Sequence, residues 1–298
     1  MTTAFLITSC TDRKRGTVAP NLQARALTAR SPGGRAQQWV KRLETAGPAR
    51  SAAVDTYVGE HWFVARNAAQ RASGLYVISA GYGLINADDR IHPYAATFTR
   101  AHADSVGATN IAQQAWWQGV NSWAGPNGVR TSLAALAEQG VLLIAASANY
   151  LTAIADDVAA IHPERALVLS AGSTGALLPD HRMAVTGKVR TTIGGSMMST
   201  NIRLADSLLQ EFGQAIDRAS ATDFLTRLEA SAAPLPVFRR TVLADETAVL
   251  RQIDRYLAGP GPHTASAGLR WLRSEGMACE QSKFARIFRS HLAGDSRS

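Results

Sequence analysis

Cysteine is scarce in this chain and long hydrophobic runs are missing from it. Only Cys10 and Cys279 occur among 298 residues, which excludes the disulfide framework of small secreted domains. No stretch has the 18 or more consecutive apolar residues of a membrane span. The first charges also follow the opening apolar segment, whereas in a secretory signal they precede it. We therefore expect a cytoplasmic protein with reduced thiols.

Two further classes of motif are missing. Histidine, cysteine and carboxylate residues have no metal-ligand spacing, and no Walker-type or dinucleotide-binding glycine motif occurs, so we predict neither a metal nor another cofactor. Arginine is abundant, and the 31 Lys+Arg against 23 Asp+Glu give a formal net charge of +8. This charge fits a partner that carries phosphates, and it also fits a protein that is merely kept soluble.

Short apolar segments alternate with helical patterns along most of the chain. The segments 3–9, 75–78, 141–146 and 166–170 lack the alternation of half-exposed strands, as expected for parallel strands covered on both faces. Each is followed by small polar residues. We predict an α/β domain over residues 1–232 with a mostly parallel, Rossmann-like sheet and flanking helices.

Two details of the helical segments can be tested. The tryptophans at 116, 117 and 123 have helical spacing, and we interpret them as a buried helix face in preference to a base-stacking platform. Gly140 follows a predicted helix over 132–139, where it is well placed for a left-handed cap.

The stretch 75–98, LYVISAGYGLINADDRIHPYAATF, is the first candidate for a functional site. It reads as a central parallel strand that leads into a glycine-punctuated loop. In open α/β sheets ligands bind outside the carboxyl ends of the strands, so the loop is expected at the site. Its glycines permit positive φ angles or the close approach of a ligand. The alternative is a turn packed for stability. The candidate residues are Ser79, Gly81, Tyr82, Gly83, Asp88, Asp89, His92 and Tyr94.

A second polar cluster, CTDRKR at 10–15, follows the first strand. Cys10 stands among basic residues, an electropositive setting that favours the thiolate. We predict that Cys10 lies close to Ser79 and Tyr82, with Asp12 and Lys14 in the same composite site. The alternatives are that Cys10 is a small residue packed at a strand end and that Lys14 is a surface charge or a phosphate clamp.

A third polar segment covers residues 178–199. Lys188, Arg190 and Ser196, with the backbone amides of residues 194–196, suggest an anion site near a helix N-terminus. A β-hairpin with a surface turn is the alternative.

The C-terminal part reads as a separate helical module. The sequence SAAPLP at 231–236 predicts a domain boundary, and we assign residues 237–298 to the module. Helices are expected over 245–257, 265–274 and 280–292, in a helix-turn-helix or winged-helix arrangement. The alternative is a helical cap with solvated arginines. The basic residues expected to contact DNA are Arg270, Arg273, Lys283, Arg286 and Arg289.

The two strand-end motifs together resemble a family pattern. ITSCTDRK at 7–14, SAGYGLI at 79–85 and Pro93-Tyr94 are similar to nucleic-acid base-modification domains. This group includes the middle domain of archaeosine synthase, which acts on a 7-cyano-7-deazaguanine base in transfer RNA, and more distantly the YaaA family of DNA-binding peroxide-stress proteins. The resemblance covers the first hundred residues, and the other domains of archaeosine synthase are lacking. It implies a nucleobase-related activity with motif positions Cys10, Lys14, Ser79, Tyr82, Gly83 and Tyr94.

Three functional hypotheses follow. In the first, the enzyme converts the 7-cyano group of a 7-deazaguanine base in DNA to an amide. The Cys10 thiolate would form a thioimidate, Asp88, Asp89 or His92 would act as general acid and base, and Ser79 or Tyr82 would bind the base. In the second, Asp88 or Asp89 hydrolyses an N-glycosidic bond without Cys10. In the third, the protein is a non-enzymatic DNA-binding stress or phage-defence protein. DNA is the expected partner, with transfer RNA as the other option.

Overall fold

The computed structural model describes residues 3–49, 51–123, 125–170, 178–183, 185–233 and 240–295. Contacts between residues divide the chain into two compact units, Met1–Pro234 and Leu235–Ser298. Each unit has its own hydrophobic core and is described by itself. None of the helices in the described ranges has the length and apolar character needed to cross a bilayer.

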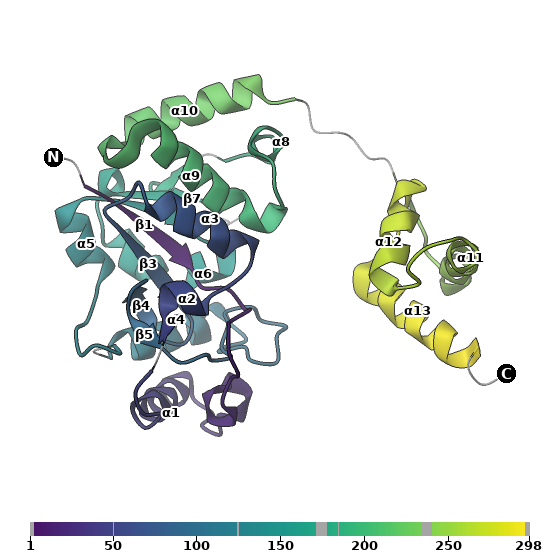
Figure 1. Ribbon diagram of the computed structural model, residues 1–298, viewed down its shortest axis with the longest axis horizontal. Coiled ribbons are helices and arrows are strands. Elements are labelled where there is room, and N and C mark those ends of the chain that lie inside the picture. The colour runs from purple at the N-terminus through teal and green to yellow at the C-terminus, as the bar shows by residue number, and fades with distance from the viewer. Residues whose placement is uncertain are drawn as a thin grey trace. The chain divides into compact units, whose positions relative to one another are not determined.

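A six-stranded sheet forms the centre of the first unit (Figure 1). Its strand order is β4-β3-β1-β6-β7-β8, and every neighbouring pair is parallel except β3 and β4. The predicted α/β class with a mostly parallel sheet is thereby confirmed. The strands are β1 (Ala4–Ser9), β3 (Gly74–Ser79), β4 (Gly83–Asn86), β6 (Val141–Ala145), β7 (Ala166–Leu169) and β8 (Arg182–Met183).

Helices cover both faces of the sheet because the strand order extends outward from β1 in two directions. The step from β1 to β3 runs one way and the step from β6 to β7 runs the other, so right-handed crossovers place their helices on opposite faces. Helices α3 (Glu60–Ala69) and α9 (Thr200–Phe212) lie side by side over one face (Figure 1). Strands β1, β6 and β7 are buried along their whole lengths, which explains their uninterrupted apolar sequences.

The remaining elements of the first unit are short pieces and peripheral helices. Helix α1 packs against α4, and α4 packs against α6. Their bounds are η1 (Pro20–Leu22), η2 (Ala24–Ala26), α1 (Pro32–Glu44), β2 (Ser51–Ala52), α2 (Ala53–Thr56), β5 (Arg90–Ile91), α4 (Asn110–Asn121), α5 (Leu133–Gln139), α6 (Ala148–Ala153), α7 (Ala155–Ala159), η3 (Pro163–Arg165), α8 (Val189–Ile193), η4 (Met197–Ser199), η5 (Gly213–Ala215) and α10 (Arg218–Ser231).

The stretch that follows β3 differs from the prediction in two ways. It is not one continuous loop, because Gly83–Asn86 forms β4 and pairs antiparallel with β3. As a result β3 is second from the edge of the sheet and not central. The reversal is a tight turn in which the Ser79 hydroxyl accepts hydrogen bonds from the backbone N–H groups of Gly81 and Tyr82, at 3.3 and 3.0 Å. Gly83 completes it with a φ of 73°, which favours glycine.

Tryptophans hold this turn from behind. The indole N–H of Trp116 donates to the carbonyl of Ala80 at 2.8 Å, and that of Trp39 donates to Gly81 at 2.7 Å. Trp116 and Trp117 are buried, which confirms their interpretation as a core-facing helix surface. These contacts join α1 and α4 to the end of β3 and fix the position of the candidate site.

Gly140 is not a left-handed cap. Its φ of −177° is extended backbone, so the predicted conformation is wrong. Glycine is required here for space, because a Cβ atom would lie 2.1 Å from the carbonyl oxygen of Thr3. That same carbonyl accepts the N–H of Val141 at 2.8 Å, so the residue secures the start of β6 against β1.

The second unit contains the three predicted helices. They are α11 (Glu246–Leu257), α12 (Ala265–Ser274) and α13 (Gln281–Asp295), and Asp245 and Thr264 cap the N-termini of the first two. Their core includes Leu272, Phe284 and Phe288. Two short strands that the sequence did not indicate, β9 (Thr241–Val242) and β10 (Met277–Ala278), pair in parallel.

Candidate active site at the carboxyl edge of the sheet

A cavity of about 410 Å³ opens where β1, β6 and β7 end. The strand order reverses direction at β1, because the chain passes from β1 to β3 on one side and returns to β6 on the other. Such a switch point is where open α/β sheets bind their ligands. The lining residues come from the three strand ends, from the segment 97–99, from α3 and α6, and from η4 and the start of α9. They are Ser9, Cys10, Thr11, Asp12, His61, Thr97, Thr99, Ala146, Ser147, Ala148, Tyr150, Ser170, Met197, Met198 and Asn201.

Cys10 lies in this cavity beside the end of β3. Its backbone N–H donates to the carbonyl of Ile78 at 3.1 Å, which continues the β1–β3 pairing by one residue. The thiol is almost completely buried, and its Sγ lies 3.2 Å from the hydroxyl of Tyr150 on α6. Burial raises the pKa of Tyr150 well above its ordinary value, so this phenol is neutral and can donate a hydrogen bond to the sulfur.

A buried hydroxyl cluster lies behind the cysteine. The Ser79 hydroxyl is 2.7 Å from the Tyr94 hydroxyl and accepts a hydrogen bond from the Tyr57 hydroxyl at 3.2 Å, and the two phenol oxygens are 3.1 Å apart. Burial is the main reason why the pKa values of Tyr57 and Tyr94 are raised, and the charge that Cys10 would carry raises them further. Both phenols therefore stay protonated.

Lys14 closes the loop that carries Cys10. Its Nζ donates to the backbone carbonyls of Thr11 at 2.9 Å and Asp12 at 3.2 Å, and it lies 4.2 Å from the centre of the Tyr94 ring. Burial lowers the pKa of Lys14. With its donors directed at the backbone and the ring, this ammonium holds the 11–14 loop in place rather than presenting an open charge to a phosphate.

Tyr82 and the two glycines of the motif lie in the packed turn outside the cavity lining. The Tyr82 hydroxyl accepts the backbone N–H of His92 at 2.9 Å, and burial raises the pKa of Tyr82. A Cβ atom on Gly81 would come within 2.6 Å of the Tyr94 ring, and one on Gly83 would meet the backbone of Asn121 at 2.9 Å. Glycine at these two positions thus permits close packing within the protein and not the approach of a ligand.

The remaining candidates of the 79–98 stretch also lie outside the cavity lining. Asp88 is exposed and lines a different groove. Asp89 accepts the N–H of Asn86 at 2.9 Å and contacts the Asn127 amide, and burial raises its pKa. The His92 ring lies 3.0 Å from the carbonyl oxygen of Gly47. The structure thus brings Cys10, Asp12, Lys14, Ser79 and Tyr94 together and leaves these three apart.

The segment 178–199 contributes only its final turn to the cavity. Strand β8 pairs in parallel with β7, so the hairpin alternative is wrong for the described residues. Arg190 belongs to α8, a helix of five residues, Lys188 is the N-cap residue before it, and neither lines the cavity. Ser196 forms a capping box with Ser199 at η4, and the adjoining Met197 and Met198 line the cavity mouth.

Besides Tyr150, two further cavity residues were missed by the sequence reasoning. Ser170, at the end of β7, is 1% exposed, and its hydroxyl has no hydrogen-bond partner among the described residues. It carries the signal used for Cys10, a polar residue directly after an apolar run. His61 on α3 lies 2.8 Å from the Thr8 hydroxyl, and burial lowers its pKa to about 4, so it is neutral at pH 7. No sequence signal marks His61.

The basic residues of the second unit differ in their availability. Arg286 is paired with Glu246 at 3.1 Å, the Lys283 ammonium donates to the carbonyl of Ala244, and the Arg289 guanidinium donates within its own helix to Ala285. Arg270 and Arg273 are exposed, and neither side chain has a partner within the described ranges. In the described part of the chain, these two arginines are the members of the predicted set whose side chains are not already paired.

Comparisons with known proteins give no relative for this chain. No family model, curated protein or solved structure matches it. Among the described residues no group of three or more His, Cys, Asp or Glu is arranged to hold a metal ion. The proposal below therefore depends on the geometry around Cys10 and on the motif resemblance.

Proposed function

We propose that the protein is a nucleobase-modifying enzyme with Cys10 as its nucleophile, and that it converts the 7-cyano group of a 7-deazaguanine base in DNA to an amide. One observation carries the proposal: the Cys10 thiol lies in a cavity at the switch point of the sheet, 3.2 Å from a neutral tyrosine hydroxyl. The cavity volume of about 410 Å³ falls within the range of small-molecule sites, roughly 300–1,000 Å³. A base taken out of its stack is a ligand of this kind.

The chemistry is an addition of water across the nitrile in two stages. The Cys10 sulfur bonds to the nitrile carbon while the thiol proton passes to the nitrogen, which gives a thioimidate. Water then adds to that carbon and the C–S bond breaks, which returns the thiol and leaves the amide. Tyr150 is placed to donate a hydrogen bond first to the sulfur and then to the developing imidate nitrogen. Lys14 positions the Cys10 loop through its two backbone contacts.

The family pattern supports the same assignment. Four of its motif positions, Cys10, Lys14, Ser79 and Tyr94, meet at the ends of β1 and β3, and the other two form the tight turn that supports them. A motif whose members converge in space is more informative than the same letters scattered over a surface.

The test is conversion of a DNA oligonucleotide that contains one 7-cyano-7-deazaguanine. We expect the wild-type protein to add the mass of one water to the oligonucleotide, and Cys10→Ala to abolish this. Cys279→Ala is the matched control, because it removes the other buried thiol, which lies in the second unit. Mass spectrometry of the protein during turnover should detect the adduct on Cys10.

The same assay separates the alternatives. Undiminished conversion by Cys10→Ala would refute the thioimidate mechanism. Release of the free base would indicate N-glycoside hydrolysis, whose candidate carboxylates Asp88 and Asp89 lie outside the lining of the Cys10 cavity. Binding of DNA without any change in the base would favour the non-enzymatic hypothesis.

A further inference from the structure

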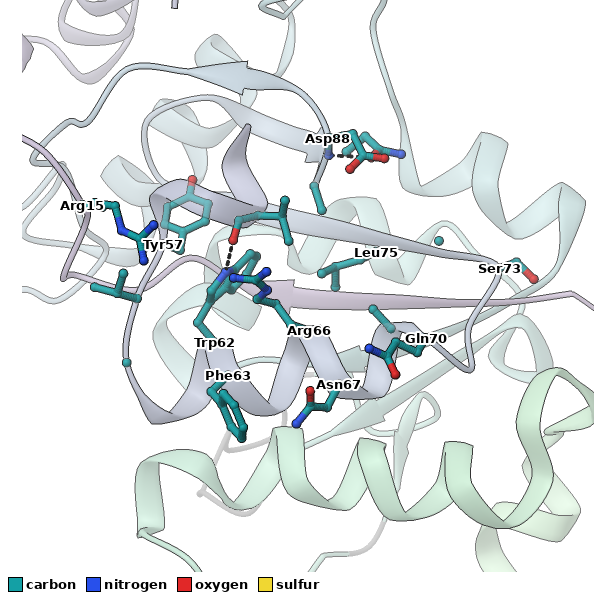
Figure 2. A pocket seen from close by; sticks show the side chains of 17 residues that line it. Arg15, Tyr57, Trp62, Phe63, Arg66, Asn67, Gln70, Ser73, Leu75 and Asp88 are labelled. Carbon is teal, nitrogen blue, oxygen red and sulfur yellow. Dashed lines mark hydrogen bonds between the residues drawn. The ribbon is translucent and has the colours of Figure 1, made fainter. Parts of the chain in front are cut away.

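A second, larger concavity lies in the same unit as the Cys10 site. It has a volume of about 800 Å³ and lies along α3, bordered by the segment 54–59 and by the end of β4 (Figure 2). Helix α3 and its C-cap residue contribute Phe63, Arg66, Asn67 and Gln70, which follow the spacing i, i+3, i+4 and i+7 and so share one face. All four side chains are exposed. We refer to this concavity as the α3 groove.

The α3 groove carries two cationic side chains, those of Arg15 and Arg66. The Arg15 guanidinium has no partner among the described residues and lies beside Tyr57 at one end of the groove (Figure 2). Arg66 lies 3.8 Å from Asp55, but both side chains are about half exposed, so this contact is weak and easily exchanged for another anion. Asp88 is the single carboxylate in the lining, and it can accept hydrogen bonds from amino groups.

Exposed aromatic surface accompanies the charge. The Phe63 side chain is 67% exposed although it is a large apolar group in the middle of a polar helix face. An exposed phenyl ring next to arginines and side-chain amides is the combination found on surfaces that stack unpaired bases and track phosphates.

The α3 groove and the Cys10 cavity are built from the same segments. Arg15 follows directly after Lys14, and hydrogen bonds from Arg15 N to Thr56 O at 2.7 Å and from Val58 N to Arg13 O at 3.2 Å bind the two segments together. Tyr57 lines the groove, while its hydroxyl belongs to the cluster behind Cys10. On α3 itself, His61 lines the cavity and Phe63 lines the groove.

We infer that the α3 groove binds a single-stranded nucleic acid that flanks the base held in the Cys10 cavity. Arg15 and Arg66 contact phosphates, Phe63 stacks on an unpaired base, and Asn67, Gln70 and Asp88 contact base edges. A single strand is favoured over a duplex because stacking on Phe63 requires a base that is not already stacked on both sides. The inference rests on the proposed function for the base held in the Cys10 cavity, whereas binding of the strand in the groove is measured independently of it.

The experiment is fluorescence anisotropy with a labelled single-stranded DNA of mixed sequence, titrated with the full-length protein at several salt concentrations. We expect Arg15→Ala and Arg66→Ala each to reduce the slope of log affinity against log salt by about 0.7, the loss of one phosphate contact. Phe63→Ala should weaken binding about fivefold or more at every salt concentration without changing that slope. Arg30→Ala, at an exposed arginine before α1, is the control and should bind as the wild type does.

Hydrogen exchange on the wild-type protein provides a measurement that needs no variant. Adding the same strand should slow exchange in residues 60–70. Unchanged exchange there, or groove variants that bind like the wild type, would overturn the inference. Loss of binding in the groove variants, together with a wild type that converts no cyano base, would uphold the groove and reject the proposed function. If the wild-type protein converts the cyano base and every groove variant binds the strand as the wild type does, the proposed function is upheld and the groove is rejected.

Discussion

Among single residues, the buried hydroxyl of Ser170 is the clearest sign that the cavity is built for a ligand. A buried hydroxyl without a partner costs roughly 1–3 kcal/mol, and Ser170 has none among the described residues. Such a cost is expected at a functional site, where the partner arrives with the ligand. We therefore expect the proposed substrate to hydrogen-bond to the Ser170 hydroxyl.

Replacing Ser170 by alanine should separate stability from binding. We expect Ser170→Ala to leave the free energy of unfolding unchanged or to raise it by up to about 1 kcal/mol, because its hydroxyl forms no hydrogen bond within the described part of the chain. The KM for the cyano-deazaguanine oligonucleotide should rise about fivefold, which corresponds to the loss of one hydrogen bond worth about 1 kcal/mol. Urea unfolding measures the free energy of unfolding, and steady-state kinetics measures the KM.

Ser199→Ala is the comparison for that experiment. Ser199 is equally buried, but its hydroxyl donates to Glu60 at 2.9 Å, so this variant should lose about 1–2 kcal/mol of unfolding free energy. If Ser170→Ala is as destabilised as Ser199→Ala and its KM is unchanged, the ligand-binding role of Ser170 is wrong.

Part of the site could be predicted from the sequence, because it depends on which residues come at the ends of the apolar segments. Cys10 follows β1 and Ser79 is the last residue of β3, and parallel strands bring such residues to one edge. Tyr150 and His61 did not follow, since their approach to Cys10 and Thr8 depends on how α6 and α3 pack. Asp88 was overestimated because an acidic residue near a motif carries no information about the direction of its side chain.

Among the elements, buried strands were predictable and the β3–β4 turn was not. β1, β6 and β7 are covered on both faces, so their uninterrupted apolar runs reveal them. β4 has only four residues and begins at a glycine, which reads as a loop. The turn before it is fixed by indole contacts from Trp39 and Trp116, which lie 42 and 36 residues away from their partners.

Gly140 gives a test of packing at the start of β6. A Cβ atom there would meet the backbone of Thr3, which cannot move like a flexible side chain. We expect Gly140→Ala to lower the unfolding free energy of the first unit by about 1–3 kcal/mol, as for other overpacked sites. Denaturant unfolding followed by tryptophan fluorescence reports mainly on this unit, which holds every tryptophan except Trp271.

Gly33 is the matched control for this substitution. It lies in the first turn of α1, and an added Cβ atom would meet nothing within 4 Å. Gly33→Ala should be neutral or should stabilise by up to about 1 kcal/mol, because alanine favours the helix. Equal effects of the two substitutions would mean that the close contact at Gly140 relaxes without cost.

At the scale of the whole molecule, the two units divide the proposed work between them. The first unit holds the Cys10 cavity and the α3 groove, and the second holds the exposed Arg270 and Arg273. The net charge of +8 allows attraction to DNA over the whole chain, but it does not say which cations make contact. The ion pairs and hydrogen bonds of the structure do show which of these cations already have a partner.

We expect the second unit to contact duplex DNA mainly through Arg270 and Arg273. The double variant Arg270→Ala/Arg273→Ala should reduce the slope of log affinity against log salt by about 1.8 for a duplex probe, since each phosphate contact contributes about 0.9. Arg286→Ala should change the slope less, because Arg286 is already paired with Glu246. Titration of a labelled duplex with the full-length variants measures both slopes. An unchanged slope in the double variant, or a larger loss in Arg286→Ala, would place the DNA-binding surface elsewhere on the protein.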